Sequence, residues 1–195
     1  MEEKRVTLKG GSVVLIRPMR SDDLDRSCAF FEAIPSEDRG FLRVDVTKRE
    51  MVAHRIRLME TGQVRRLVAV ADDAIVADGA LELSGHGWKQ HVAEIRLIVA
   101  VDYRRKGLGM LMARELYLLA AAEKVEQVVV KMMRPQYAAH DIFKRLGFGE
   151  QALLPEYVKD RDGRKQDLIL MRCDLQAMWK RLEDYLQELD WQRTR

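Results

Sequence analysis

The segment Arg104-Arg105-Lys106-Gly107-Leu108-Gly109 lies between an apolar, strand-like run and a long helix-forming run. Residues 92–101 are rich in β-branched side chains, and residues 108–123 consist almost entirely of strong helix formers. A further apolar run, Val128-Val129-Val130, follows the helix. The order of strand, glycine turn, helix and strand predicts a βαβ unit with two neighbouring parallel strands.

The chemistry of this segment is that of an anion-binding turn. Its glycines let successive backbone N–H groups point the same way, beside the positive end of the helix macrodipole. Gly107 and Gly109 remove Cβ atoms that would hold a phosphate away, and the basic residues 104–106 add positive charge. The segment therefore predicts a pyrophosphate cradle, with a simple helix start as the alternative. It is neither a dinucleotide fingerprint nor a P-loop, because GxGxxG and Gly-Lys-Ser/Thr are both incomplete.

The rest of the chain alternates between strand and helix patterns. Ser21 is typical of a helix N-cap, and Gly147 of a helix end. The predicted strands are 13–16, 66–71, 75–83, 149–158 and 167–173, and the predicted helices begin near residues 21, 47 and 136. These elements predict an α+β fold, in which helices flank a mixed, mostly antiparallel sheet.

Composition excludes several classes of protein. With 34 Lys and Arg against 31 Asp and Glu, the dispersed excess of positive charge does not predict a nucleic-acid partner. Cys28 and Cys173 lack the spacing of a zinc site or a disulfide framework, so no metal is expected. The charged N-terminus has no apolar core, and no apolar run reaches the length of a membrane span. We therefore expect a cytoplasmic protein without a membrane partner.

The motif Arg104-x-x-Gly107-x-Gly109 after an apolar strand resembles the (Gln/Arg)-x-x-Gly-x-(Gly/Ala) signature of the GCN5-related N-acetyltransferase (GNAT) superfamily. The block Phe143-Lys144-Arg145-Leu146-Gly147-Phe148 is similar to the family's Tyr-x-Lys-Leu-Gly-Phe. The pair Ala93-Glu94 is similar to one in bacterial protein-lysine acetyltransferases. The resemblance implies an acyl-CoA N-acyltransferase fold that uses acetyl-CoA as its acyl donor.

The resemblance covers roughly residues 12–173, which we expect to form one GNAT domain. Beyond it, apolar residues recur at spacings of three and four, which predicts an additional amphipathic C-terminal helix over residues 174–195. This helix packs either on its own domain or on a second copy of the chain, so a homodimer is the alternative assembly.

The resemblance also implies a set of residues that bind CoA. The sheet is expected to splay where the pantetheine arm inserts and pairs with the backbone of one strand. Arg105 replaces the usual glycine, and an arginine there can meet the 3′-phosphate. The implied contacts are Ile98, Val99 and Ala100 for pantetheine, residues 104–109 (Arg104, Arg105, Lys106, Gly107, Leu108 and Gly109) for pyrophosphate, and Gln136 and Phe143 for the CoA arm.

Acetyl transfer requires a neutral amine, so a general base is expected. Glu94 is the candidate, because it lies ten residues before Arg104 among apolar neighbours expected to raise its pKa. The alternative is an ordinary solvated or ion-paired glutamate. Phe143 replaces the tyrosine that often protonates the leaving thiolate, so either the thiolate leaves unassisted or Tyr137 or Tyr157 substitutes.

Three functions are consistent with this sequence. The first is an N-acetyltransferase that modifies a primary amine, on a protein lysine or a small molecule. The second is an acyl-CoA sensor without turnover, favoured by Phe143. The third is an interaction role for the C-terminal helix. His86 and His91 flank Trp88 near the expected substrate side, where surface histidines are the alternative to a catalytic role.

Overall fold

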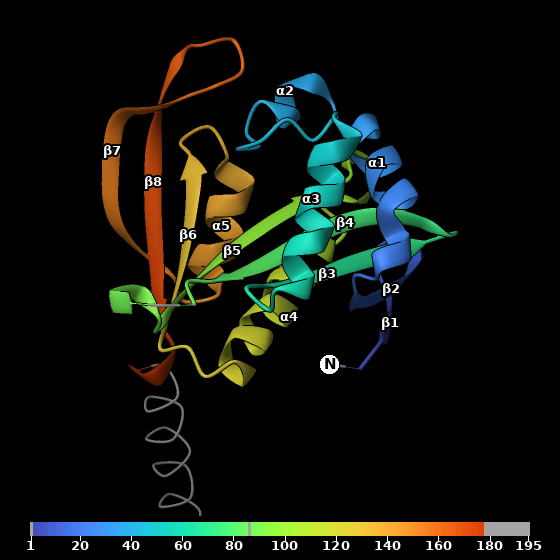
Figure 1. Ribbon diagram of the computed structural model, residues 1–195, viewed down its shortest axis with the longest axis horizontal. Coiled ribbons are helices and arrows are strands. Elements are labelled where there is room, and N and C mark those ends of the chain that lie inside the picture. The colour runs from blue at the N-terminus through green and yellow to red at the C-terminus, as the bar shows by residue number, and fades with distance from the viewer. Residues whose placement is uncertain (1, 86, 178–195) are drawn as a thin grey trace, which may run out of the picture.

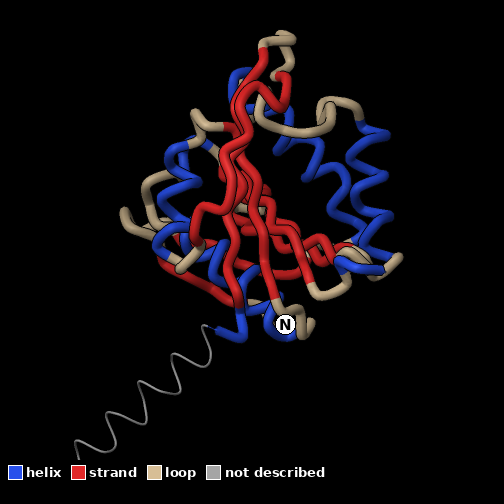
Figure 2. The backbone as a smooth tube through the Cα atoms, turned by 90° about the vertical axis from the view of Figure 1, so that its left-hand side faces the viewer, coloured by secondary structure: helices blue, strands red, loops and turns tan. Residues whose placement is uncertain are grey.

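The computed structural model describes residues 2–85 and 87–177. It confirms the predicted α+β class, with one eight-stranded sheet between two layers of helices (Figures 1 and 2). The order of strands across the sheet is β1-β2-β3-β4-β5-β6-β8-β7, and only the pair β5–β6 is parallel. The strands are β1 (Lys4–Thr7), β2 (Val13–Pro18), β3 (Val64–Ala71), β4 (Ala74–Leu83), β5 (Val92–Val99), β6 (Gln127–Met133), β7 (Gly149–Lys159) and β8 (Lys165–Asp174).

Helices cover both faces of the sheet. Two of them, α4 (Leu108–Ala122) and α5 (Tyr137–Arg145), lie on one face. The other face carries α1 (Leu24–Ala33) and α3 (Arg49–Glu60), and the short α2 (Ser36–Arg39) lies between them in the chain. The parallel pair β5–β6 joined through α4 confirms the predicted βαβ unit.

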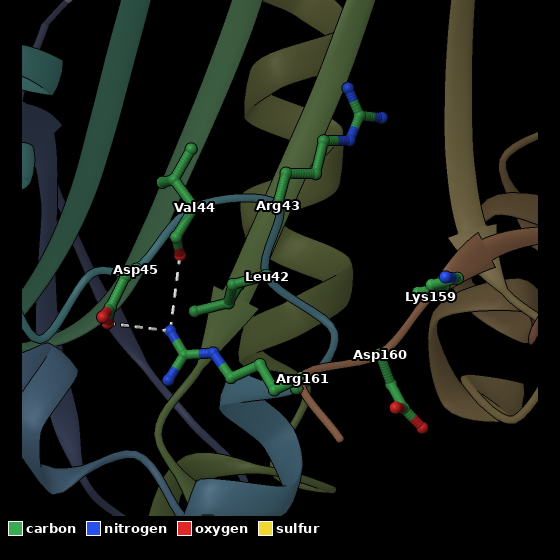
Figure 3. Close-up of a pocket in the computed structure, with 8 residues that line it drawn as sticks. Leu42, Arg43, Val44, Asp45, Lys159, Asp160 and Arg161 are labelled. Atoms are coloured by element: carbon green, nitrogen blue, oxygen red, sulfur yellow. Dashed lines mark hydrogen bonds and ion pairs between the residues drawn. The ribbon is translucent and has the colours of Figure 1, made fainter. Parts of the chain in front are cut away.

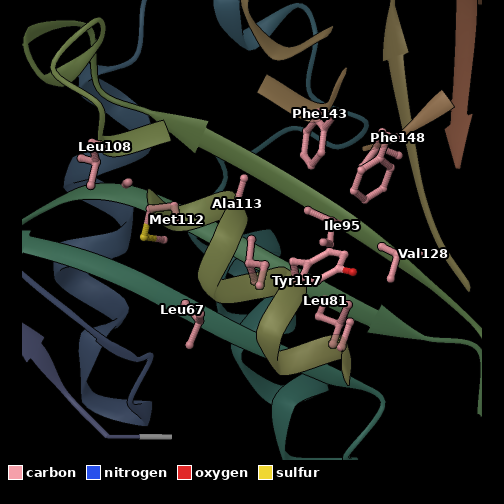
Figure 4. Close-up of a cluster of buried hydrophobic side chains, with 14 of the residues drawn as sticks. Leu67, Leu81, Ile95, Leu108, Met112, Ala113, Tyr117, Val128, Phe143 and Phe148 are labelled. Carbon is pink, nitrogen blue, oxygen red and sulfur yellow. The ribbon is translucent and has the colours of Figure 1, made fainter. Parts of the chain in front are cut away.

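The α4 face has an almost entirely apolar core (Figure 4). Met112 and Leu116 of α4 are fully buried against β4. Gly79 of β4 makes this approach possible, because a Cβ there would lie 2.7 Å from Leu116 Cδ1. The long helix that carries the glycine turn is therefore held rigidly against the sheet.

The sheet splays between β5 and β6. Only residues 92–94 of β5 pair with residues 127–129 of β6, although both strands continue beyond this contact. Beyond the last pair, β6 stays with β8 up to Met133, while β5 stays with β4 up to Val99 (Figure 1). Among the described residues, no strand therefore covers the edge of the second half of β5.

Some expectations from the sequence were wrong in detail. Ser21 does not cap α1, because it begins a 3-10 turn in which the Asp23 carboxylate accepts a hydrogen bond from the Arg20 N–H at 2.8 Å. Strand β1 was not expected, because it is only four residues long and its charged residues Lys4 and Arg5 interrupt the apolar pattern that predicts a strand. Most of the predicted C-terminal helix, residues 178–195, lies outside the described residues.

Candidate active site

The open edge of β5 presents backbone groups of alternate residues. The Ala100 N–H donates to the Val76 carbonyl at 2.9 Å, toward β4. The His91 carbonyl accepts from the Gln127 N–H at 3.0 Å, toward β6. Because backbone groups alternate along a strand, the odd-numbered residues Leu97 and Val99 direct their N–H and C=O groups into the splay.

This alternation sharpens the predicted pantetheine contacts. Val99 faces the splay as expected, but the amide of Ala100 is already used by β4 and the backbone of Ile98 faces the same way. Leu97, which the sequence analysis did not name, directs its backbone into the splay as Val99 does. The two-residue spacing between Leu97 and Val99 could have predicted this, since residues two apart on one strand share a hydrogen-bonding side.

The glycine turn contains two residues in the left-handed conformation, Arg105 with φ 58° and Gly107 with φ 92°. A side chain at Gly107 would meet no atom within 4 Å, so this glycine is required by its backbone conformation. The same conformation costs a non-glycine residue about 1–2 kcal/mol, which is the physical reason that a glycine is usual where this chain has Arg105.

Gly109 has a different role from the one expected. Its missing Cβ faces α5, where it would lie 2.9 Å from Ile142 Cδ1, so the expectation that Gly109 makes room for a phosphate was wrong. The residue allows α4 to begin close to α5. Leu108 is fully buried, and only its backbone is available to a ligand. The Lys106 ammonium lies 5.3 Å from the centre of the Tyr103 ring.

Arg104 lies across the end of the splay. Its Nε donates to the Val99 carbonyl at 2.9 Å, and its Nη2 pairs with Asp38 of α2 at 2.8 Å. The first residue of the basic turn therefore contacts the strand edge that is expected to receive pantetheine.

The two remaining predicted CoA contacts lie at the ends of α5. Gln136 accepts a hydrogen bond from the Met133 N–H at 2.8 Å through its Oε1, which satisfies the end of β6. Phe143 is buried against Phe148, with ring centres 5.2 Å apart in an edge-to-face arrangement (Figure 4). Tyr137 is 71% exposed at the start of α5, and Tyr157 is also exposed.

Glu94 lies on the opposite face of β5 from the apolar core. Its carboxylate accepts hydrogen bonds from Lys131, at 2.8 Å, and from Arg43, and Arg96 lies 3.9 Å away. Burial by itself raises the pKa of Glu94, but the hydrogen bond from Lys131 and the charge of Arg43 outweigh it, and the pKa lies below its usual range. The expectation of a raised pKa was wrong, because Ala93 and Ile95 point to the other face.

Glu94 belongs to a layer of charged side chains between the sheet and α3. Arg66 and Arg55 both donate to Asp78 Oδ1, Arg55 at 3.2 Å, and Arg96 pairs with Glu82 at 2.8 Å. Burial lowers the pKa of Arg55 to about 10. This face of the sheet is therefore partly ionic where the α4 face is apolar.

A cavity of about 390 Å³ opens beside this charged layer (Figure 3). It lies between the loop that follows α2 and the turn between β7 and β8. Arg161 of the turn pairs with Asp45 of the loop at 3.1 Å. The lining residues are Gly40, Leu42, Arg43, Val44, Asp45, Lys159, Asp160 and Arg161.

The other predicted positions lie away from this cavity or outside the described residues. His91 directly precedes β5, at the opposite end of that strand from the glycine turn, and His86 is not among the described residues. Within residues 2–85 and 87–177, no group of three ligating side chains is placed to hold a metal. No helix in the same part of the chain is long and apolar enough to cross a membrane.

Comparison with known proteins places this geometry in a family. The family model for the acetyltransferase (GNAT) domain matches residues 63–150, which include β5 and the glycine turn. No curated protein matches the chain at the level of sequence. The chain therefore carries a match to a GNAT acetyltransferase domain over residues 63–150, as its motifs indicated.

Solved structures share the fold at low sequence identity. A ribosomal-protein-alanine N-acetyltransferase from Brucella melitensis is 21% identical, with a TM-score of 0.71 over 82% of this chain and 99% of that chain. The Salmonella typhimurium protein yncA, solved with its cofactor acetyl-CoA, is 17% identical (TM-score 0.73; 83% and 94%). The GNAT domain of S. lividans PAT is also 17% identical (TM-score 0.71; 89% and 97%).

Proposed function

We propose that the protein is an N-acetyltransferase that transfers an acetyl group from acetyl-CoA to a primary amine. The observation that supports this proposal is the uncovered edge of β5. This strand leads into a turn with two left-handed residues, and Glu94 lies on the face of the strand that is turned away from the apolar core. The edge suits an extended amide-containing ligand, and the turn suits its phosphates.

The chain offers suitable groups for each part of acetyl-CoA. The backbone groups of Leu97 and Val99 suit the amides of pantetheine, and the N–H groups of residues 105–109 suit the pyrophosphate, since the Arg104 N–H already donates to the Val101 carbonyl. Arg105 supplies a charge for the 3′-phosphate, and Gln136 and Phe143 border the arm from α5. The solved yncA structure, which holds acetyl-CoA, supports the choice of ligand.

Acetyl-CoA supplies an acetyl thioester, and the chain must manage the proton of the amine. The amine nitrogen forms the new C–N bond as the C–S bond breaks, and one amine proton passes to the Glu94 carboxylate, directly or through water. The Leu97 and Val99 N–H groups both face the splay, and the one that does not pair with pantetheine is available to stabilise the developing oxyanion. Because residue 143 is phenylalanine, the thiolate leaves without help from that side chain.

The second candidate function is an acyl-CoA sensor without turnover. Two observations favour it, namely the buried Phe143 where a hydroxyl is usual and the lowered pKa of Glu94, which makes this carboxylate a weak base in the free protein. Both candidates require CoA binding, so only turnover separates them.

Substitution of Glu94 by Gln tests the proposal. We expect kcat/KM for acetyl transfer to fall by about 10²–10⁴-fold, because the proton acceptor is lost, while the Kd for CoA stays within about twofold. Glu82→Gln is the matched control, since Glu82 lies on the same face and pairs with Arg96. Full activity of Glu94→Gln would remove Glu94 from this role, and CoA binding with no turnover on any amine would favour the sensor.

The finer assignments rest on the sequence. A likeness to bacterial protein-lysine acetyltransferases makes a protein lysine one possible acceptor, and a small-molecule amine is the other. We also propose a cytoplasmic location, a domain over residues 12–173, no nucleic-acid or membrane partner, and a possible homodimer through residues 174–195. Size-exclusion chromatography of the full chain against a chain ending at residue 177 tests the last point.

A further inference from the structure

Glu94 is surrounded by more positive charge than its single carboxylate neutralises. Lys131 and Arg43 both donate to it, and Arg96 approaches it while pairing mainly with Glu82. Among the described residues, Lys131 and Arg43 have no other ion-pair partner. Two cations therefore share one carboxylate at this point of the sheet.

Both cations keep unused hydrogen-bond donors. A guanidinium carries five N–H groups and an ammonium three, and Glu94 accepts one contact from each. The side chains of Arg43 and Lys131 are 39% and 35% exposed, so a ligand can reach them. Arg43 also lines the cavity of about 390 Å³ (Figure 3), and its guanidinium donates to Glu94.

These charges act in opposite ways on two kinds of acceptor. A polycationic acceptor gains attraction from Glu94 but suffers repulsion from Arg43 and Lys131 at close range. An acceptor that carries a carboxylate together with its amine satisfies both, because the carboxylate can form charge-assisted hydrogen bonds with the two cations. The volume of the cavity is in the range of small-molecule sites.

We propose that the acceptor is a small amine bearing a carboxylate, which binds Arg43 and Lys131 while its amine lies at Glu94. This inference rests on the proposed N-acetyltransferase function and narrows its substrate class. It makes Arg43 and Lys131 residues that determine specificity. They come from the loop after α2 and from β6, which is the neighbour of β5 in the sheet.

Binding of such an acceptor would also change the basicity of Glu94, which is weak in the free protein. The hydrogen bonds from Lys131 and Arg43 are among the causes that lower its pKa. When the carboxylate of the acceptor binds the remaining donors of these two cations, its negative charge offsets part of their positive charge, and Glu94 becomes a stronger proton acceptor. The acceptor that fits the site thus activates the base, and an amine without a carboxylate does not.

A series of matched amines tests this inference on the full chain. The probes are the ω-amino acids from glycine to 6-aminohexanoate, each compared with its own primary amide, which has similar size but no negative charge. One measurement is kcat/KM from release of the CoA thiol, and the other is the Kd of each probe for the CoA-bound protein by calorimetry. We expect at least one acid to exceed its amide at least tenfold in kcat/KM or affinity.

Variants then assign the preference to the two cations. We expect Arg43→Gln and Lys131→Met each to reduce the preference for acid over amide to less than about threefold, and Lys131→Arg to retain most of it. Arg65→Gln removes one positive charge at a distant pair with Glu123 and should leave the preference unchanged. In Arg43→Gln, the acid limb of the pH profile of kcat/KM should also move to higher pH, because Arg43 no longer lowers the pKa of Glu94. A purely structural role of Arg43 would not cause this shift.

Each outcome has a distinct meaning. Amides used or bound as well as their acids, or a preference that survives in both Arg43→Gln and Lys131→Met, would overturn the inference while leaving acetyl transfer intact. A peptide with acidic residues beside its lysine that outperforms every small acid would also overturn it, in favour of a protein acceptor. Failure of the proposed function itself would show as an absence of turnover with every acid, amide and peptide, whether or not CoA binds.

Discussion

The two faces of the sheet are built by different means. On the α4 face, the glycine turn is built from the backbone geometry of neighbouring residues, and the core beneath it consists of apolar side chains from α4, α5 and most strands of the sheet. On the α3 face, the candidate acceptor site consists of charged side chains from β3, β4, β5, β6, α3 and the loop after α2. In the proposed reaction the acyl donor is always acetyl-CoA, which backbone groups can bind. The choice of the acceptor amine depends on side chains.

This difference predicts which substitutions matter on each face. Charge should dominate stability and specificity on the α3 face, and shape and backbone conformation should dominate on the α4 face. Four substitutions test this contrast, in decreasing order of expected effect.

The largest effect is expected for Asp78→Ala on the α3 face. It leaves Arg66 and Arg55 without their shared carboxylate in a buried environment, and we expect a loss of about 3–5 kcal/mol in the free energy of unfolding. Urea denaturation measures it. Glu3→Ala, which removes the exposed pair with Arg20, is the control and should cost about 0–1 kcal/mol. Equal costs would contradict the view that buried charge organises this face.

On the α4 face, Gly79→Ala should destabilise the protein through shape alone. The new methyl group would lie 2.7 Å from Leu116 Cδ1 and 3.4 Å from Met112 Cε, and overpacking of this kind costs about 1–3 kcal/mol. Thermal unfolding measures the loss. In a Leu116→Val background the cost of Gly79→Ala should shrink, and additive costs would mean that the contact with Leu116 is not the cause.

A smaller effect of opposite sign is expected for Arg105→Gly. Glycine relieves the left-handed backbone at φ 58°, so the free energy of unfolding should rise by about 0.5–1 kcal/mol. Arg105→Ala keeps the strain and should bring no such gain. Both variants lose the positive charge, so both should weaken CoA binding to a similar extent; a deficit confined to one of them would show that backbone conformation, and not charge, governs binding.

The smallest expected effect is the dependence of stability on pH through Glu94. Its pKa in the folded protein is lowered from the usual 4.5, so its contribution is complete above pH 4.5 and is lost as pH falls through the lower folded value. The stability difference between wild type and Glu94→Gln should be constant from pH 5 to 7 and shrink below that, by at most about 1.4 kcal/mol per pH unit. A constant difference down to pH 3 would contradict the ion-paired arrangement.

The contrast between the faces also explains which features of the structure could be predicted from the sequence. The strands β2 to β8, the parallel pair around α4 and the turn at Gly107 were predicted, because each depends on local periodicity or on a residue's own backbone preference, whereas the short helix α2 was not predicted. The sequence did not reveal that the backbone of Leu97 faces the splay, since this depends on which side of β5 pairs with β4. The reason for Gly109 was misjudged, because Ile142 lies 33 positions further along the chain.

By itself, the sequence determined that this protein has a GNAT-type βαβ unit with a basic glycine turn, since these features arise from neighbouring residues. Only the tertiary structure decided the electrostatic state of Glu94. Its partners Arg43 and Lys131 are 51 and 37 residues away in sequence, and the fold alone brings them to one carboxylate. The pKa of a side chain depends on charges within a few ångströms in space, and sequence separation does not report those distances.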